Sequence, residues 1–310
     1  MSESGSKESR GKQAATRRQV PGPLAIFNLQ LLVAVVFLGV LTALIVVSWR
    51  RYGDQLLAGD RFQISPARIQ VTALPDWIES DVVAQVLRDG SLDNASLLDR
   101  EITVQIAQSF QMHSWVEKVR RVSKHPDGRV LVELDYRRPV AMVEVEGGLL
   151  PVDREGVLLP PDDFSATAAR RFARIAVGET RPLGQVGTPW GDPRVIGAAR
   201  IAAAFGESWR ELGLYRIEAL PTSAANPSQG NPLFELYTRQ HVRIRWGHAP
   251  DEETRGEALA AEKFARLFEY IQTSGPLDAV DGPAEVDLRD PKEISVVPRT
   301  AARRVLRESR

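Results

Sequence analysis

The spacing of apolar and polar residues divides the 310-residue chain into three kinds of segment. Residues 1–23 are rich in serine, lysine and arginine and contain few apolar residues. Residues 24–47 are apolar apart from Asn28, Gln30 and Thr42, and they carry no charge. From about residue 61 onward, apolar residues recur at every second or every fourth position over short stretches. The pattern predicts a disordered tail, one continuous apolar helix, and then a region of mixed helices and strands.

The apolar segment has the length and the flanking residues of a membrane anchor. Twenty-four helical residues rise about 36 Å, enough to cross a hydrocarbon core of about 30 Å. Pro21 and Pro23 precede the segment, and the aromatic and basic residues 49–52 follow it, as is common at a membrane interface. The segment lacks the amphipathic stripe of a helix packed on a globular core, and a cleaved signal peptide would have a shorter apolar run and an Ala-x-Ala site. We therefore expect an uncleaved single-pass anchor over residues 24–47.

Basic residues flank this segment on both sides, with a small excess before it. Those before it are Lys7, Arg10, Lys12, Arg17 and Arg18, and those after it are Arg50, Arg51, Arg61 and Arg68. The positive-inside rule then predicts that the tail 1–23 lies in the cytoplasm. The rest of the chain is predicted to lie in the periplasm, outside the cytoplasmic (inner) membrane.

Residues 61–137 have the pattern strand, helix, helix, strand, strand. A strand is expected over 62–71, and an amphipathic helix over 76–90, where apolar residues lie four apart and Gly90 ends the helix. Asp99 is the expected N-cap of a second helix, which contains Ile102 and Phe110. Two helices on one face of a small sheet make an α+β domain.

The last two strands of this domain form a predicted hairpin. Residues 125–128 read His-Pro-Asp-Gly, which is strong turn chemistry because proline fixes φ and glycine tolerates positive φ. After the turn, apolar Val130, Val132 and Leu134 alternate with polar residues, which is the pattern of a half-buried strand.

Residues 138–298 are predicted to form a second domain, richer in strands and with two helices. Strands are expected within 141–160 (three), 215–219, 234–237, 242–246, 285–288 and 294–297. One helix should follow Asp192-Pro193, and a longer one should run from about 252 to 273. The buried side of the longer helix is expected to hold Leu259, Phe264, Leu267 and Ile271. A loop at 221–232 and a basic tail at 299–310 complete the chain. Such an arginine-rich tail is usually a solvated terminus, although it also suits anionic lipid, wall polymer or an acidic partner.

The side chains that carry enzyme chemistry are sparse. The chain has no cysteine, and its four histidines, His113, His125, His241 and His248, do not have the spacing of metal ligands. Carboxylates at 153, 162, 163, 287 and 290 fall in turns or at strand ends, where we interpret them as solvated turn residues. Gly-x-Ser-x-Gly, P-loop and dinucleotide-binding motifs are absent from the sequence, and no Ser-x-x-Lys lies near a helix start that would suit an acyl-transfer serine. We expect no enzyme activity, cofactor, metal or small-molecule substrate, and the zero formal net charge gives no reason to expect nucleic acid as a partner.

Several stretches together resemble the FtsQ/DivIB family of cell-division proteins. In the stretch 114–141 the matching residues are Trp115, Val116, Val119, Arg121, Pro126, Asp127, Val130, Val132, Arg138, Pro139, Val140 and Ala141. Further matches are Pro-Val-Asp-Arg-Glu-Gly at 151–156, VRIRWG at 242–247, the lysine-bearing helix around Lys263, and AEVDLRDPKEISVV at 284–297. Asp135 stands where the family usually has glutamate. The resemblance covers about residues 24–298.

The resemblance implies a single-pass scaffold of the septal cell-wall machinery, with 61–137 as a POTRA domain and 138–298 as the family's β-domain. It also implies a membrane pair similar to FtsL and FtsB as docking partners. A last strand at the edge of a sheet can accept a partner strand through its unpaired N–H and C=O groups. The residues expected to form this docking edge are Glu293, Ile294, Ser295, Val296 and Val297.

Two other interpretations stay open on the sequence. An anchored POTRA protein can instead act as a chaperone or secretion factor for exported chains, with the same anchor and hairpin. The last strand can also be covered by its own tail or by a neighbouring strand, which would remove the docking edge.

Overall fold

The computed structural model describes residues 23–57, 63–92, 95–220 and 231–299. Residues 1–22 of the predicted tail, 221–230 of the predicted loop and 300–310 of the basic tail lie outside the described residues. The chain forms two compact units, residues 1–61 and 62–310, which are described one at a time. Its fold is α+β, with one apolar helix near the N-terminus and a large mixed sheet, as the sequence predicts.

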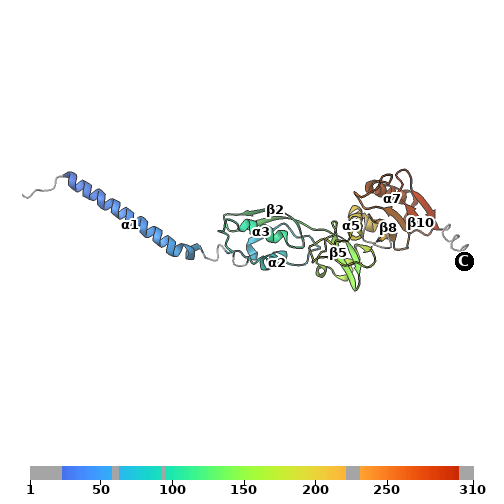
Figure 1. Cartoon of the computed structure of the whole chain (residues 1–310), viewed down its shortest axis with the longest axis horizontal. Helices are drawn as coiled ribbons and strands as arrows, with labels where there is room; N and C mark the ends of the chain where they lie inside the picture. Colours follow the sequence, from blue (N-terminus) through green and yellow to red (C-terminus); the bar gives the residue numbers. More distant parts are fainter. Residues whose placement is uncertain (1–22, 58–62, 93–94, 221–230, 300–310) are drawn as a thin grey trace, which may run out of the picture. The chain divides into compact units, whose positions relative to one another are not determined.

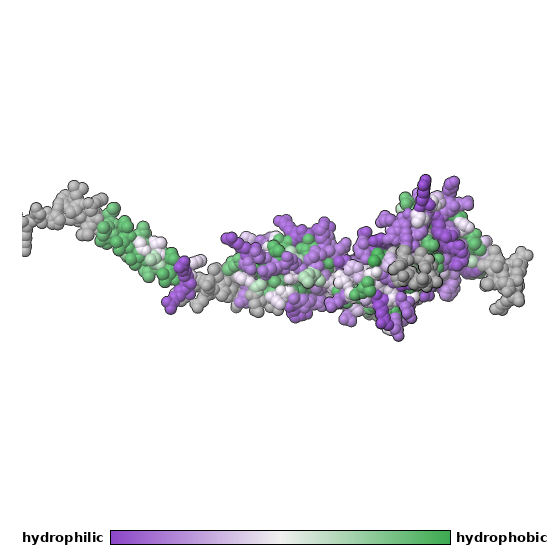
Figure 2. Space-filling model, in the orientation of Figure 1, coloured by the Kyte–Doolittle hydropathy of each residue, from purple (hydrophilic) through white to green (hydrophobic). Residues whose placement is uncertain are grey.

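The first unit contains a single described helix, α1 (Pro23–Leu57). Within it, residues Leu31–Arg51 have a mean hydropathy of 3.0 and none of them is buried (Figures 1 and 2). Twenty-one residues rise about 31 Å, which matches a hydrocarbon core. This length and apolarity suit a membrane anchor or a signal sequence. Elsewhere in the described ranges, no helix has comparable length and apolarity.

The helix α1 continues beyond residue 47, where the sequence analysis ended it. Trp49, Arg50 and Arg51 are part of the helix and do not follow it. The apolar pattern marks the part that fits a membrane, whereas the helix itself has no proline to stop it on this side.

The second unit begins with a three-stranded sheet and two helices, which we call the N-terminal module (residues 63–137). Its elements are η1 (Pro66–Arg68), β1 (Ile69–Val71), α2 (Val82–Asp89), α3 (Ile102–Gln111), β2 (Val116–Lys124) and β3 (Val130–Tyr136). The strand order is β1-β3-β2, with β1 parallel and β2 antiparallel to β3. The predicted order strand, helix, helix, strand, strand is therefore present. Ile102, Ile106 and Phe110 of α3 pack in one core with Val130 and Val132 of β3.

Local boundaries in this module differ from the predicted ones. The first strand is shorter than predicted, because Pro66 begins a turn of 3₁₀ helix. The helix α2 begins at Val82 and not at residue 76, because Asp81 caps it by accepting from the Ala84 N–H at 3.0 Å. Asp99 does not cap α3; its carboxylate accepts from the N–H of Glu101, two residues on, at 3.0 Å.

The predicted hairpin between β2 and β3 is confirmed. The His125 N–H donates to the Arg129 carbonyl at 2.8 Å, and Gly128 has φ 83. Val130, Val132 and Leu134 are buried, while Glu133 between them is exposed.

The remaining residues, 138–299, form what we call the C-terminal module. Its strands are β4 (Pro139–Val145), β5 (Gly148–Asp153), β6 (Ala173–Ala176), β7 (Leu214–Leu220), β8 (Leu233–Thr238), β9 (Arg243–Gly247), β10 (Pro283–Asp287) and β11 (Ser295–Pro298). Its helices are η2 (Pro161–Asp163), α4 (Ala166–Ala169), α5 (Pro193–Phe205), α6 (Ser208–Glu211) and α7 (Ala260–Ser274). The strands make one eight-stranded sheet with the order β11-β10-β9-β8-β7-β6-β4-β5.

The two faces of this sheet have opposite character. The register aligns apolar residues on one face, where helices α5 and α7 contribute to the same core. The apolar residues of the strands are Ala141, Val143, Ile175, Ile217, Leu236, Ile244 and Val286. The alternate positions carry charge, and they are Glu144, Arg174, Arg216, Glu218, Glu235, Arg243, Arg245 and Glu285. One face is therefore buried and the other is covered by ion pairs.

The C-terminal module also differs from its predicted elements in three places. The sequence analysis missed β6, a four-residue strand that pairs in parallel with both β4 and β7. The third strand expected before residue 160 is present only as isolated bridges at Val157 and Leu158. The long helix begins at Ala260 and not near 252; Leu259 is 58% exposed, and the fully buried side chains are Lys263 and Leu267.

The two modules meet at Arg137 and Asp153. The Arg137 backbone belongs to the N-terminal module, where its N–H donates to the Trp115 carbonyl at 2.9 Å. Its guanidinium Nη1 lies 2.6 Å from Asp153 Oδ2, and the Asp153 side chain is only 4% exposed. The other oxygen of Asp153 accepts from the N–H groups of Glu155 and Val157. Asp153 is thus a buried ion-pair partner, and its interpretation as a solvated turn residue was wrong.

We expect Asp153→Asn to destabilise the full chain in detergent by about 3 kcal/mol, because it leaves the partly buried Arg137 charge without its counter-ion. The measurement is urea unfolding followed by circular dichroism. The matched control is Glu155→Gln, which removes an exposed pair with Arg154 and should cost less than about 1 kcal/mol. Equal losses from the two substitutions would contradict a structural role for the Arg137–Asp153 pair.

Candidate functional site

The predicted docking residues lie at one end of the eight-stranded sheet. Ser295, Val296 and Val297 belong to β11, whereas Glu293 and Ile294 immediately precede it. Among the described residues β11 pairs only with β10, in an antiparallel register, and it is the terminal strand of the sheet. No neighbouring strand of the described chain covers its outer edge. Whether this edge binds a partner stays a prediction.

Side chains on β11 alternate between the two faces of the sheet. Val296 is half-buried and pairs with Val286, on the face that carries the hydrophobic core. Ser295 and Val297 are exposed on the charged face, where Val297 is paired with Glu285. The half-buried Ile294 also packs against the core. A strand added beside β11 would therefore meet an apolar environment on one face and a polar one on the other.

The charged face next to this edge is held by ion pairs. Glu285 Oε1 lies 2.6 Å from Arg245 Nε, and Glu285 Oε2 accepts from Arg243. That hydrogen bond raises the pKa of Arg243, so its guanidinium stays charged. Further along, the Tyr237 hydroxyl donates to Glu235 at 2.6 Å, and burial together with this bond raises the pKa of Tyr237. The ion pairs of Glu285 with Arg243 and Arg245 therefore tie β10 to β9 beside the edge.

The connection between β10 and β11 is fixed at its start. The Arg289 guanidinium donates through Nε and Nη2 to the Asp287 carboxylate, with a shortest distance of 2.5 Å. Burial opposes ionisation of Asp287, but the hydrogen bonds from Arg289 outweigh it and lower the pKa of Asp287. Arg266 of α7 donates to the Asp290 carbonyl at 2.5 Å. Helix α7 thus holds the connection that leads to β11.

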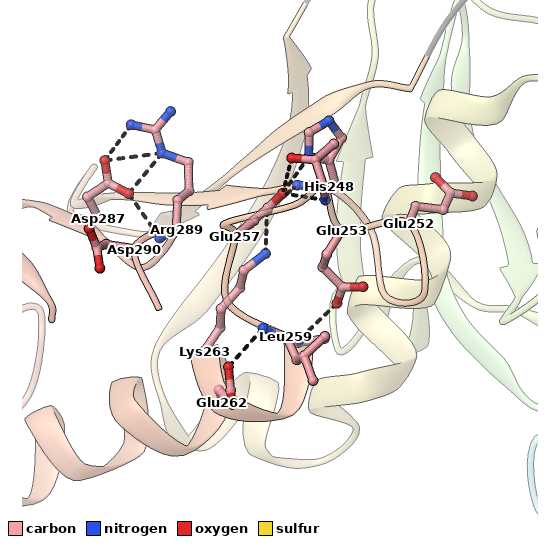
Figure 3. Close-up of polar contacts among 12 residues, drawn as sticks. His248, Glu252, Glu253, Glu257, Leu259, Glu262, Lys263, Asp287, Arg289 and Asp290 are labelled. Carbon is pink, nitrogen blue, oxygen red and sulfur yellow. Dashed lines mark hydrogen bonds and ion pairs between the residues drawn. The ribbon is translucent and has the colours of Figure 1, made fainter. Parts of the chain in front are cut away.

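A buried polar cluster supports this end of the sheet, and we call Lys263, Glu257 and His248 the polar anchor. The Lys263 side chain is fully buried, and its Nζ lies 2.6 Å from Glu257 Oε1 (Figure 3). The His248 Nδ1 lies 2.5 Å from Glu257 Oε2, and the His248 N–H donates to Oε1 at 2.8 Å. Burial opposes ionisation of Glu257, but the bonds from Lys263 and His248 prevail and lower its pKa to about 2. Glu257 is therefore an ionised acceptor surrounded by donors.

The anchor explains why the chain before α7 is not helical. Glu257 points back toward the end of β9, and a Cβ atom on Gly247 would come within 2.0 Å of Glu257 Oε1. Gly247 also has φ 95, which favours glycine. Ala258, which follows Glu257, donates its N–H to the Arg289 carbonyl at 2.9 Å. The segment 248–259 therefore wraps around a carboxylate and ties β9 to the connection before β11.

The contacts of the polar anchor join α7 to the segment that follows β9. The anchor does not line the large groove of about 1190 Å3 in the second unit, whose lining includes Trp77, Arg138 and Trp209. Within the described ranges, histidine and carboxylate side chains are not grouped in threes that could hold a metal ion.

The sequence analysis missed the anchor because it read Lys263 only as part of a family-like motif. The helical spacing carried a signal, since Lys263 lies four residues before buried Leu267 and eight before Ile271. A lysine in an apolar stripe requires a buried carboxylate partner, and Glu257 was the acid available six residues earlier.

Comparison with protein-family models and with curated proteins finds no match for the chain. The resemblance to the FtsQ/DivIB family is therefore carried by the quoted motifs alone.

We expect Lys263→Met to destabilise the full chain by about 3 kcal/mol, since Glu257 would be left buried without its cation. The free energy of unfolding in urea measures this. Arg266→Met is the matched control on the same helix, because it removes a partly exposed cation, and its cost should be smaller. A Lys263→Met protein as stable as the wild type would rule out the anchor.

The anchor also predicts a pH dependence. The pKa of Glu257 is about 2 in the folded chain and near 4.5 when unfolded, so its stabilisation is complete above pH 4.5 and disappears as the pH falls toward 2. Unfolding free energies measured across this window should fall less steeply for Glu257→Gln than for the wild type. Parallel curves for the two proteins would contradict the assigned ion pair.

Proposed function

We propose that the chain is a non-enzymatic, single-pass scaffold of the bacterial division machinery, related to the FtsQ/DivIB proteins. In this proposal α1 anchors it in the cytoplasmic membrane with the N-terminus inside, and the N-terminal module is a POTRA domain in the periplasm. The C-terminal module docks a membrane pair similar to FtsL and FtsB. The observation that carries the proposal is the terminal position of β11, whose outer edge has no strand beside it in the described chain.

Strand addition at this edge follows from the chemistry of the backbone. Along an edge strand, every second residue points its N–H and C=O groups to the outside. A partner strand satisfies these groups. Four residues of β11, Ser295–Pro298, offer a short site for such pairing. Because Pro298 has no N–H, the useful donors lie in the first three residues.

The two faces beside β11 also set the kind of strand that fits. Next to Val296 and Ile294, the added strand meets the hydrophobic core and needs apolar side chains. Next to Ser295 and Val297 it lies on the charged face, where polar side chains remain solvated. The partner is therefore expected to present a segment in which apolar and polar residues alternate.

Proline substitutions test this edge. Adjacent residues of a strand point their N–H groups in opposite directions, so one of Ser295 and Val296 donates outward and the other toward β10. We expect Ser295→Pro or Val296→Pro, whichever removes the outward N–H, to abolish co-purification of the FtsL/FtsB-like pair from the same organism. Ser295→Ala and Val296→Ala are the matched controls and should retain the pair.

Circular dichroism and thermal unfolding of each variant separate lost binding from lost folding. A folded proline variant at each position with unchanged binding would reject the site.

The cellular role has a separate test. Fluorescently tagged chain should form bands at midcell, and its depletion should block septation. A uniform envelope signal with normal septation would contradict a role in division and favour the chaperone or secretion interpretation.

A further inference from the structure

His113 lies between α3 and β2, at the place where the N-terminal module meets the C-terminal module. Its Nδ1 accepts the backbone N–H of Trp115 at 3.2 Å. Because that N–H can only donate, Nδ1 carries no proton, and the other ring nitrogen bears the hydrogen. This nitrogen, Nε2, lies 2.9 Å from Gln85 Oε1 of α2 and donates to it. The contact at Nδ1 therefore requires neutral imidazole, and together the two contacts select the tautomer with its hydrogen on Nε2.

Trp115, the residue that His113 holds, joins the two modules. Its side chain is fully buried, and its indole Nε1 donates at 2.6 Å to Asp163 Oδ2 in η2 of the C-terminal module. The same carboxylate oxygen accepts from the Ser80 hydroxyl at 3.0 Å. The Trp115 ring also packs near Phe164, with ring centroids 6.1 Å apart. Its carbonyl accepts from Arg137, the residue paired with Asp153.

The chain next to His113 has little room to move. A Cβ atom on Gly187 of the C-terminal module would lie 3.1 Å from the Cα of Ser114. Ser114 links His113 to Trp115, so a shift of this segment changes the contact between the modules. The imidazole is thus positioned to control a tight joint and not only a local turn.

We propose that His113 is an acid-sensitive latch on the joint between the N-terminal and C-terminal modules. When Nδ1 takes up a proton, it can no longer accept the Trp115 N–H, and that buried donor loses its partner. The positive charge of the imidazolium is attracted to the Asp163 carboxylate, which the Trp115 indole binds. One proton from the solvent forms an N–H bond at Nδ1, and otherwise only hydrogen bonds change, so the step is reversible.

The charged groups that face the imidazole raise the pKa of His113, whereas burial lowers it. These groups are Asp89 of α2 and Asp163 of η2, and both favour the protonated ring. Burial is the larger influence and lowers the pKa of His113 below 6.5. The neutral ring therefore stabilises the joint fully above about pH 6.5, and this contribution is lost as the pH falls toward the pKa of the folded state. The latch does not depend on the proposed docking function.

The absence of cysteine makes the joint accessible to spin labelling. Gln105→Cys on α3 and Glu146→Cys in the β4–β5 turn place one label on each module, both at exposed positions. The histidine signals of the full chain in nanodiscs are first titrated by NMR, and His113→Asn identifies the His113 signal. Distances between the labels are then measured by pulsed electron resonance one pH unit above and one below the pKa of His113.

We expect a narrow distance distribution above that pKa and a broader or shifted one below it. His113→Asn, which keeps a neutral hydrogen-bonding group at the Nδ1 position, should give a narrow distribution at both values. His125→Asn changes an exposed turn histidine and should behave like the wild type. A label pair within the N-terminal module, Gln105→Cys with Glu133→Cys, should not respond, which separates a joint movement from unfolding.

Three results would overturn the latch. The first is an unchanged inter-module distribution when NMR shows that His113 is protonated. The second is a pH response in His113→Asn equal to that of the wild type. The third is a His113 signal that does not titrate above about pH 4, since the site would then stay neutral wherever the chain is folded.

Discussion

A terminal strand of a sheet leaves one row of backbone N–H and C=O groups without partners, and β11 has this position in the described C-terminal module. Unpaired backbone groups are costly when they are removed from water, and another strand satisfies them better than any side chain does. Ion pairs stabilise the charged face of the sheet, and helices α5 and α7 pack on its apolar face. The outer edge of β11 is therefore one end at which this sheet can be extended.

The buried polar contacts explain how the edge is held in place. Lys263 and Glu257 tie α7 to the segment that follows β9, and that segment in turn bonds to Arg289 at the end of β10. A hydrophobic contact in place of Lys263 and Glu257 would stabilise the fold without fixing the orientation of the two segments. An ion pair with several donors allows few geometries. At the other end of the sheet, Asp153 of β5 pairs with Arg137 and has the same role between the modules. Arg137, Asp153 and Lys263 lie in stretches that resemble the family motifs, and their contacts give these residues a structural role.

Periodicity was sufficient to predict most regular elements. The hairpin at 125–128, the α5 start at Asp192 and the strands β7 to β10 were found because turn residues and alternation act locally. The pattern failed where a distant contact decided the outcome. Strand β6 is too short to show alternation and exists because β4 and β7 pair with it on either side. Likewise, residues 252–259 were predicted to be helical but form a loop. In this loop the Glu257 carboxylate contacts Lys263 and His248, which lie outside it. For the proposed docking edge, the sequence could predict the last strand. Its terminal position in the sheet became visible only from the strand order.

Amide hydrogen exchange at residues 295–297 tests the central claim most directly. The full chain in nanodiscs would be compared with and without the FtsL/FtsB-like pair, and exchange would be followed by NMR. The account predicts that the outward amide among these residues becomes protected when the pair binds, while amides of β10 keep their rates. Binding of the pair with no added protection in β11 would contradict it.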